Sequence, residues 1–258
     1  MNIVVCVKQV PDTGAERNLR AEDARLDRAS ADGLMNELDE YAIEEGLRLT
    51  EAHGGEVTIL SMGPEQASET IRKALSMGAA KGILVTDDAA LPGADALVTA
   101  RVLAAAIKKV DAVDLVICGV ESTDGSAGIL PGMIAELLGM PQVTFAKHLE
   151  LKDGTLTVNR QTVAGYDVVE CPLPAVLSVT AGVNEPRYPT FKGIMQAKSK
   201  PVDQLTVGDL GLSGDDVKAT QEVAGVNPAP ARGAGEKFED DGTGAAKIAD
   251  FLKNAKVI

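Results

Sequence analysis

Small and hydroxyl-bearing residues gather in one stretch of this chain, residues 119–128, which reads GVESTDGSAG. We expect it to be a loop between a buried strand and a helix, because apolar segments flank it on both sides. Small side chains let backbone N–H groups approach an anion, and the following helix presents its positive N-terminus. Ser122, Thr123 and Ser126 add hydroxyl donors. The loop therefore fits a phosphate site, although a polar loop without a ligand has the same residue types.

Two acidic residues, Glu121 and Asp124, lie within this loop. A carboxylate that pointed at a phosphate would repel it, so we expect Asp124 to cap the helix or to hold the loop instead. The loop is not a Walker A motif, because no Gly-Lys-Ser/Thr follows, and no GxGxxG motif follows the first apolar run. The pattern thus indicates an anion site that belongs to neither of these nucleotide-binding classes.

The chain offers no pair of residues suited to covalent catalysis. His53 and His148 stand alone on segments expected at the surface, so neither suggests a Ser–His or Cys–His pair. Cysteine, histidine and acidic residues show no metal-ligand spacing. Cys6, Cys118 and Cys171 lie far apart in apolar segments, which is typical of buried thiols in a reducing cytoplasm. We therefore expect a protein without catalytic residues or metal ligands of its own.

A second informative stretch runs from residue 173 to residue 201. It begins as an apolar strand and becomes polar at NEPRYP, where two prolines exclude a helix. It then places Phe191, Ile194 and Met195 beside Lys192 and Lys198. An ordinary connector also exposes apolar residues. An apolar tip with a lysine rim on an acidic chain nevertheless favours a surface that binds a partner.

Composition narrows the possible partners. The 258 residues carry a formal net charge of −13, and 45% of them are hydrophobic, which suffices for a sizeable core. So acidic a chain is unsuited to non-specific nucleic-acid binding, which needs a basic surface. No apolar run approaches the roughly 18 residues of a membrane span, and the N-terminus MNIVVCVKQVPD resembles a first strand rather than a signal peptide. We expect a soluble cytoplasmic protein.

The elements that position these stretches alternate between strand and helix. Apolar runs predict strands at residues 3–10, 57–62, 83–85 and 113–118. Helical periodicity predicts helices at residues 38–52, 64–78, 95–109 and 128–138, the first with Glu44, Glu45 and Arg48 on its outer face. Strict alternation implies right-handed crossovers. The fold class is therefore α/β, with a doubly wound, largely parallel, Rossmann-like sheet.

The pattern changes from His148 onward. Alternating residues on either side of Asp153-Gly154 predict a β-hairpin, and further strands are expected at 166–171 and 175–180. We assign residues 1–190 to one core with this antiparallel extension. Residues 202–258 lose periodicity, contain a Pro/Ala/Gly-rich linker at 227–235, and end in a helix at 244–256 with Ile248, Phe251 and Leu252 as an apolar stripe. This C-terminal arm is either disordered or wraps another subunit.

Residues 183–201, VNEPRYPTFKGIMQAKSKP, closely resemble the signature LNEPRYPTLPNIMKAKKK of the electron transfer flavoprotein β subunit, the FixA family. The resemblance implies an adenine-nucleotide α-hydrolase-like core and makes residues 184–201 a recognition loop for a partner dehydrogenase. Phe191 stands where the family has an apolar anchor, usually Leu. Lys192-Gly193 replaces Pro-Asn, so we expect a more flexible loop. The implied docking residues are Arg187, Tyr188, Phe191, Lys192, Ile194, Met195 and Lys198.

Three further segments resemble the same family. The loop from Gly119 is similar to GKQAIDGDTAQVGP, which holds AMP, with Val120-Glu121 in place of Lys-Gln and Ile129-Leu130 in place of Gln-Val. VCVKQV at 5–10 is similar to VAVKxV, and MNELDEYAIEE at 35–45 is similar to MNPFDExAxEEA. The resemblance implies that AMP contacts Cys6, Asn36, Glu37, Leu38, Asp39, Met62, Gly119, Thr123, Asp124, Gly125, Ser126, Ala127, Gly128, Ile129, Leu130, Pro131 and Gly132.

The resemblance also implies a role in electron transfer. With no Trp, 3 Tyr and 4 Phe, this chain has few rings to enclose a flavin by itself. In the family, an α subunit holds most of the FAD and the β subunit shields part of it. Arg160 corresponds to an arginine near the flavin, followed here by Gln161 instead of a carboxylate. The C-terminal arm would pack on the α subunit.

The implied heterodimer accepts electrons from acyl-CoA and related dehydrogenases and passes them to a membrane quinone oxidoreductase. Two alternatives share the same α/β half. A stand-alone adenine-nucleotide-binding protein would be a homodimer with no use for residues 173–201. An electron-bifurcating relative would hold a second FAD where we place AMP.

Overall fold

The computed structural model describes residues 1–258 except 228, 232, 234, 236 and 238. Within this part of the chain, one sheet of nine strands runs in the order β11-β5-β4-β1-β6-β10-β7-β8-β9, and β2 and β3 form a separate pair. The strands are β1 (Asn2–Cys6), β2 (Gln9–Pro11), β3 (Gly33–Met35), β4 (Glu56–Met62), β5 (Lys81–Val85), β6 (Leu115–Gly119), β7 (Gln142–Lys152), β8 (Thr155–Thr162), β9 (Gly165–Pro172), β10 (Ala175–Val179) and β11 (Val202–Leu205).

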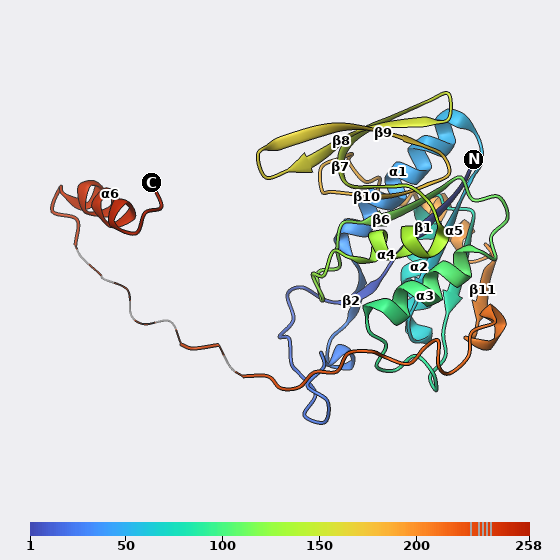
Figure 1. The fold of residues 1–258 in the computed structure, drawn as a ribbon, viewed down its shortest axis with the longest axis horizontal. Coiled ribbons are helices and arrows are strands. Elements are labelled where there is room, and N and C mark those ends of the chain that lie inside the picture. Colours follow the sequence, from blue (N-terminus) through green and yellow to red (C-terminus); the bar gives the residue numbers. More distant parts are fainter. Residues whose placement is uncertain (228, 232, 234, 236, 238) are drawn as a thin grey trace. The chain divides into compact units, whose positions relative to one another are not determined.

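Helices cover both faces of the main sheet (Figure 1). They are α1 (Glu37–His53), α2 (Ser68–Met77), α3 (Ala96–Ile107), α4 (Leu130–Leu138) and α5 (Phe191–Ala197). A further helix, α6 (Gly244–Asn254), belongs to the separate C-terminal unit. Along β1, Ile3 and Val5 pack into the cluster that includes α1, α2 and α5, whereas Val4 packs into the cluster that includes α3 and α4. Successive strand residues point to opposite faces, so both faces of a parallel sheet are buried. The doubly wound α/β fold is confirmed.

The antiparallel extension continues the same sheet. β7 runs parallel to β10, and β8 and β9 follow as antiparallel strands. The hairpin turn between β7 and β8 is Asp153-Gly154, where both residues have positive φ, as the tight turn requires. β7 begins at Gln142, earlier than the change of pattern at His148 suggested.

The strand predicted at residues 3–10 is wrong as one element. β1 ends at Cys6, and β2 pairs with β3 outside the main sheet. The break is caused by a segment distant in sequence, because the backbone N–H of Lys8 donates to the Asp39 carboxylate at 2.7 Å and its carbonyl accepts from Asn36 at 3.0 Å. The helix predicted from Pro64 begins as a short 3-10 turn, η2 (Glu65–Ala67), before α2. It ends before Gly78, as expected.

The outer face predicted for α1 is also wrong in part. Glu44 and Glu45 are each 5% exposed, whereas Arg48 lies at the surface. Both carboxylates are covered by residues 184–187, which cross α1. Periodicity within a helix cannot reveal a distant segment that buries its polar face.

Residues 184–201 are not irregular throughout, because α5 forms within them. The Thr190 hydroxyl caps this helix by accepting from the backbone N–H of Gly193 at 3.0 Å. A Cβ at position 193 would lie 2.4 Å from the carbonyl oxygen of Ser76. The glycine that suggested a flexible loop therefore lets α5 pack closely against the end of α2.

The chain divides into two compact units, Met1–Val223 and Ala224–Ile258. The first continues beyond the core predicted to end near residue 190, because β11 pairs with β5 and η3 (Gly208–Leu210) adds Leu210 to the core. In the second unit, α6 confirms the predicted helix and exposes Ile248 and Phe251, with Leu252 half-buried. The linker predicted at 227–235 includes positions 228, 232 and 234, which lie outside the described residues.

Among the residues that the structure describes, no helix has the length and apolar character to cross a membrane.

Candidate functional site

The predicted anion loop lies at the carboxyl end of β6, between Gly119 and the start of α4. The carboxyl ends of β1 and β4 meet the same edge of the sheet, since both run parallel within it. Ligands of open α/β sheets bind at this edge. The fold therefore brings Cys6, Met62 and the loop to one edge, as the resemblance implied.

Asn36 joins three segments at this edge. Its side-chain amide donates to Asp39 Oδ1 at 2.9 Å and to the carbonyl of Glu121 at 3.0 Å. Its Oδ1 accepts from the backbone N–H of Thr123 at 3.0 Å. With 1% of its surface exposed, Asn36 is occupied in holding the loop against the start of α1. We interpret Asn36 as a residue that fixes the shape of the loop from its buried side.

Asp39 and Gly119 are closely packed against each other. A Cβ at Gly119 would lie 2.5 Å from Asp39 Oδ1 and 2.9 Å from the backbone of Leu38, so this position requires glycine. Burial raises the pKa of Asp39 to about 7. Hydrogen bonds from Asn36, Lys8 and Gly119 oppose that rise, because N–H donors favour the charged carboxylate.

Asp124 holds the loop, which was one of the two roles expected for it. Its side chain is 2% exposed and pairs with Lys8 Nζ at 2.8 Å and with Arg28 Nη2 at 2.7 Å. Lys8 Nζ also lies 3.4 Å from Ser122 Oγ. Two cations face the Asp124 carboxylate and more than neutralise it, so Asp124 itself does not repel an anion, and the exposed Glu121 is the remaining negative charge of the loop. Neutralising Asp124 removes one obstacle to binding an anion at this loop.

One polar group at the loop is left without a partner. The buried Oγ1 of Thr123 makes no hydrogen bond within the described part of the chain. Buried hydroxyls are normally paired, so an orphan is a feature that a ligand could satisfy. Gly125, Ser126 and Ala127, which follow it in the loop, are exposed. The residues present therefore fit a phosphate-bearing ligand.

The remaining residues implied by the resemblance differ in accessibility. Gly128, Leu130 and Gly132 are partly exposed, Pro131 is buried, and Ile129 is exposed. Leu38 is half-buried and Glu37 is exposed on the first turn of α1. Cys6 faces Cys118 across β1 and β6, and the hydrogen bond with Cys6 together with burial raises the pKa of the Cys118 thiol. Cys171 is also buried.

Arg160 lies elsewhere, on β8, separated from β6 by β10 and β7 in the sheet order. Its guanidinium stacks 5.8 Å from the ring centre of Phe145, which is 38% exposed. A cation over an aromatic face is attractive, so Phe145 holds the charge of Arg160 at the root of the extension.

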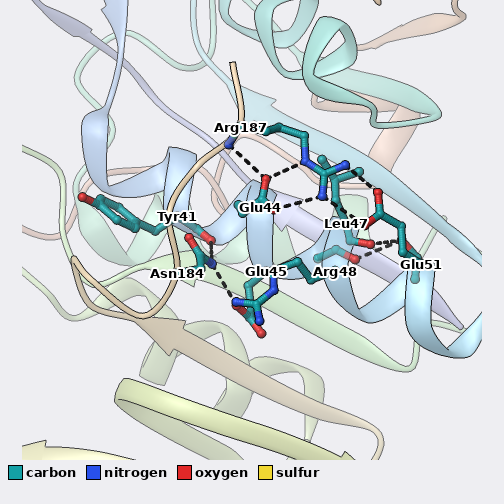
Figure 2. Close-up of polar contacts among 10 residues, drawn as sticks. Tyr41, Glu44, Glu45, Leu47, Arg48, Glu51, Asn184 and Arg187 are labelled. Carbon is teal, nitrogen blue, oxygen red and sulfur yellow. Dashed lines mark hydrogen bonds and ion pairs between the residues drawn. The ribbon is translucent and has the colours of Figure 1, made fainter. Parts of the chain in front are cut away.

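The docking residues of the recognition loop gather on and next to α5. Tyr188 and Phe191 are 94% and 80% exposed, and Ile194 and Met195 are about half exposed beside the exposed Lys192 and Lys198. Arg187 is placed differently. Its side chain turns toward Glu44 and Glu51 of α1 (Figure 2).

Sequence reasoning missed Lys8 and Arg28 as site residues. Lys8 gave a weak signal, since a lysine interrupts an otherwise apolar run. Arg28 gave no signal, because it belongs to η1 (Arg28–Ser30) in the polar segment that follows β2. It lies 96 positions before Asp124.

Taken together, the geometry defines an α/β protein with a candidate ligand site at the carboxyl ends of its parallel strands and a separate exposed apolar helix. The chain belongs to the electron transfer flavoprotein family: the model of the electron transfer flavoprotein domain matches residues 23–210. This confirms the family suggested by residues 183–201.

Relatives that match over most of both chains support the same family. The chain is 45% identical to the electron transfer flavoprotein subunit beta of Mycobacterium tuberculosis, over 100% of this chain and 99% of the relative. It is 40% identical to the corresponding subunit of Thermoanaerobacterium thermosaccharolyticum over 92% of each chain. It is also 38% identical to the caffeyl-CoA reductase-Etf complex subunit CarD of Acetobacterium woodii, over 98% of this chain and 96% of the relative.

The ion pairs of Asp124 predict a pH-dependent stability. Burial opposes its ionisation, but Lys8, Arg28 and Ser122 outweigh burial and lower its pKa from 3.8 to about 2. A lowered folded-state pKa adds stability above the unfolded value, here about 2 kcal/mol, and about half of it is lost by pH 3. Urea unfolding of wild type and Asp124→Asn should therefore differ by less at pH 3 than at pH 6. An equal difference at both pH values would rule out an ionised Asp124 as the cause.

Proposed function

We propose that this chain is the β subunit of a heterodimeric electron transfer flavoprotein, which binds AMP at the 119–132 loop and completes an FAD site held mainly by an α subunit. In this proposal it is an electron-carrier subunit without catalytic residues of its own. The heterodimer accepts electrons from acyl-CoA and related dehydrogenases and passes them to a membrane quinone oxidoreductase. We place it in the cytoplasm.

The observation that carries the docking part of the proposal is α5. A folded helix exposes Phe191, Ile194 and Met195 together, although apolar side chains of this size are usually buried. Lysines 192 and 198 rim this apolar group. An aromatic anchor in an apolar patch with a charged rim is typical of a hot spot. Such a surface fits a dehydrogenase that offers an apolar pocket edged with acidic residues.

AMP would be held by the loop and by the charges behind it. The backbone near Gly125 and the unpaired hydroxyl of Thr123 supply donors for a phosphate, and Lys8 supplies a nearby positive charge. Cys6 and Met62, both half-buried at the strand ends, offer an apolar surface for a base. A nucleotide here would tie β1, β4, β6 and α4 together, so its role would be structural.

FAD, when bound, supplies the chemistry of accepting and releasing electrons. This chain would contribute Arg160, whose guanidinium is held over Phe145 at the root of the extension and can place positive charge beside a reduced flavin. The C-terminal arm would contribute the contact with the α subunit. Its helix α6 exposes Ile248 and Phe251 on one side, an apolar stripe suited to packing on another chain.

Cofactor content tests this proposal and separates it from its two rivals. We expect the chain co-expressed with a candidate α subunit to purify as a yellow heterodimer. Heat denaturation should release FAD and AMP in equal amounts, measured by chromatography and absorbance. A second FAD without AMP would support an electron-bifurcating protein instead. A colourless homodimer that does not bind the α subunit would support a stand-alone nucleotide-binding protein.

A further inference from the structure

The guanidinium of Arg187 lies between two carboxylates of α1 (Figure 2). Nε and Nη2 donate to the two oxygens of Glu44 at 2.7 and 2.9 Å, which is a bidentate pair. Nη1 and Nη2 also donate to Glu51, and the backbone N–H of Arg187 donates to Glu44 at 3.2 Å. The planar fork is thus engaged on both edges within the chain itself. The polar groups of this side chain are thus turned toward α1, and 33% of the side chain remains exposed.

A second contact holds the same segment to the next residue of α1. The amide of Asn184 donates to Glu45 Oε2 at 2.8 Å and to the carbonyl of Tyr41 at 3.0 Å (Figure 2). The adjacent residues Glu44 and Glu45 therefore receive donors from the two ends of the segment 184–187. Two neighbouring contacts leave this short piece of backbone little freedom to shift along the helix.

The burial of the two carboxylates makes their pairing with residues 184–187 necessary. Glu44 and Glu45 are each 5% exposed, and a buried carboxylate is strongly unfavourable unless it is paired and hydrogen-bonded. Any movement of the segment that removed Arg187 would leave Glu44 charged and unpaired. The two carboxylates therefore fix the position of residues 184–187 on α1.

The fixed segment leads directly into the exposed helix. Phe191 follows Arg187 by four residues, which span at most about 14 Å when extended. The far end of α5 is held as well, because Arg72 donates to the carbonyls of Ala197 and Lys200 at 2.7 Å each. Lys200 in turn donates to the carbonyl of Leu75 in α2 at 2.9 Å and to that of Ala79, just after this helix, at 2.6 Å. The helix is thus anchored to α1 before its first residue and to α2 after its last.

We propose that Arg187 is a positioning residue, whose ion pairs with Glu44 and Glu51 hold α5 in the orientation that the electron-donating flavoenzyme binds, without touching that partner itself. This rests on the proposed docking function of α5. A helix already held in its bound orientation loses less conformational freedom on association. The arginine therefore acts on the affinity for the partner and not on the electron-transfer step.

The test uses the intact heterodimer with two independent measurements. The first is hydrogen–deuterium exchange of residues 189–198, which needs no partner. The second is the reduction of the heterodimer by a purified acyl-CoA dehydrogenase with its acyl-CoA substrate, analysed as KM for the heterodimer and kcat. For Arg187→Met we expect at least tenfold faster exchange in α5, a KM raised at least fivefold, and a kcat within twofold of wild type. Arg187→Lys should recover part of both losses.

A double variant separates positioning from mere stability. Arg187→Met alone leaves Glu44 buried without its partner and should lower the thermal midpoint, whereas Arg187→Met with Glu44→Gln should restore much of it. We expect the double variant to keep the raised KM and the fast exchange in α5. Arg20→Met serves as the control, because it removes an arginine–carboxylate pair from an exposed loop.

Each outcome decides between the alternatives. Recovery of KM together with the thermal midpoint in the double variant would overturn the proposal, since Arg187 would then act through stability alone. Wild-type exchange and KM in Arg187→Met would overturn it as well. If the dehydrogenase fails to reduce the wild-type heterodimer, the docking function of α5 is wrong. The exchange measurement then still decides whether Arg187 holds this helix.

Discussion

Replacing Phe191 by alanine should slow reduction of the heterodimer by its dehydrogenase at least tenfold while leaving the fold unchanged. The side chain is 80% exposed, so its removal creates no cavity in this chain. An aromatic anchor buried in a partner's pocket contributes about 2 kcal/mol or more to binding, which corresponds to about 30-fold in affinity. Stopped-flow flavin reduction at sub-saturating heterodimer measures the effect directly.

The control for this experiment is Leu19→Ala. Leu19 is 50% exposed on the loop that follows β2, so the variant removes a large exposed apolar side chain at a distance in sequence from the docking helix. We expect wild-type reduction rates for it, and wild-type heterodimer formation for both variants. If Phe191→Ala were reduced at the wild-type rate, the assignment of α5 as the docking surface would be wrong.

Replacing Asn36 by alanine should have the largest effect on stability and on nucleotide content. The variant removes the donors to Asp39 and Glu121 and leaves the backbone N–H of Thr123 without its acceptor, all at a buried position. Lost hydrogen bonds and newly unsatisfied buried groups cost about 1–3 kcal/mol each, so we expect about 3 kcal/mol in total after relaxation. The loop also loses its preformed shape, and AMP affinity should fall at least tenfold.

Two measurements keep these effects apart. Urea unfolding of nucleotide-stripped protein reports the stability of the chain itself, because bound ligand would add its own stabilisation. Calorimetric titration with AMP reports the affinity. Asn159→Ala, on β8, is the matched control and should change neither. Unaltered stability in Asn36→Ala would show that the amide does not hold the loop, whereas unaltered affinity would place the nucleotide elsewhere.

Several features could be predicted because the signal for them is local. The alternation of apolar strands with amphipathic helices identified the α/β sheet, since each element's spacing reflects its own burial. Asp153-Gly154 identified the hairpin, because both residues tolerate the positive φ that the turn needs. The order of residues in 183–201 identified the family, although it gave no indication that α5 is a helix packed on α2.

Other features depend on contacts between distant segments. The strand after Cys6 breaks because Asn36 and Asp39 take the polar backbone groups of Lys8. Glu44 looked solvent-exposed by its helical spacing, yet Arg187, 143 positions away, covers and neutralises it. No local pattern encodes a partner that only folding brings near.

The amino-acid sequence by itself determined the α/β class, the position of the polar loop at a strand end, and the membership of the electron transfer flavoprotein family. Only the tertiary structure decided which charges meet. It showed Lys8 and Arg28 on Asp124, Asn36 behind the loop, and Glu44 and Glu51 on Arg187. The physical reason is that backbone propensity and burial act along neighbouring residues, whereas ion pairs at a buried site require specific groups from remote parts of the chain to arrive together.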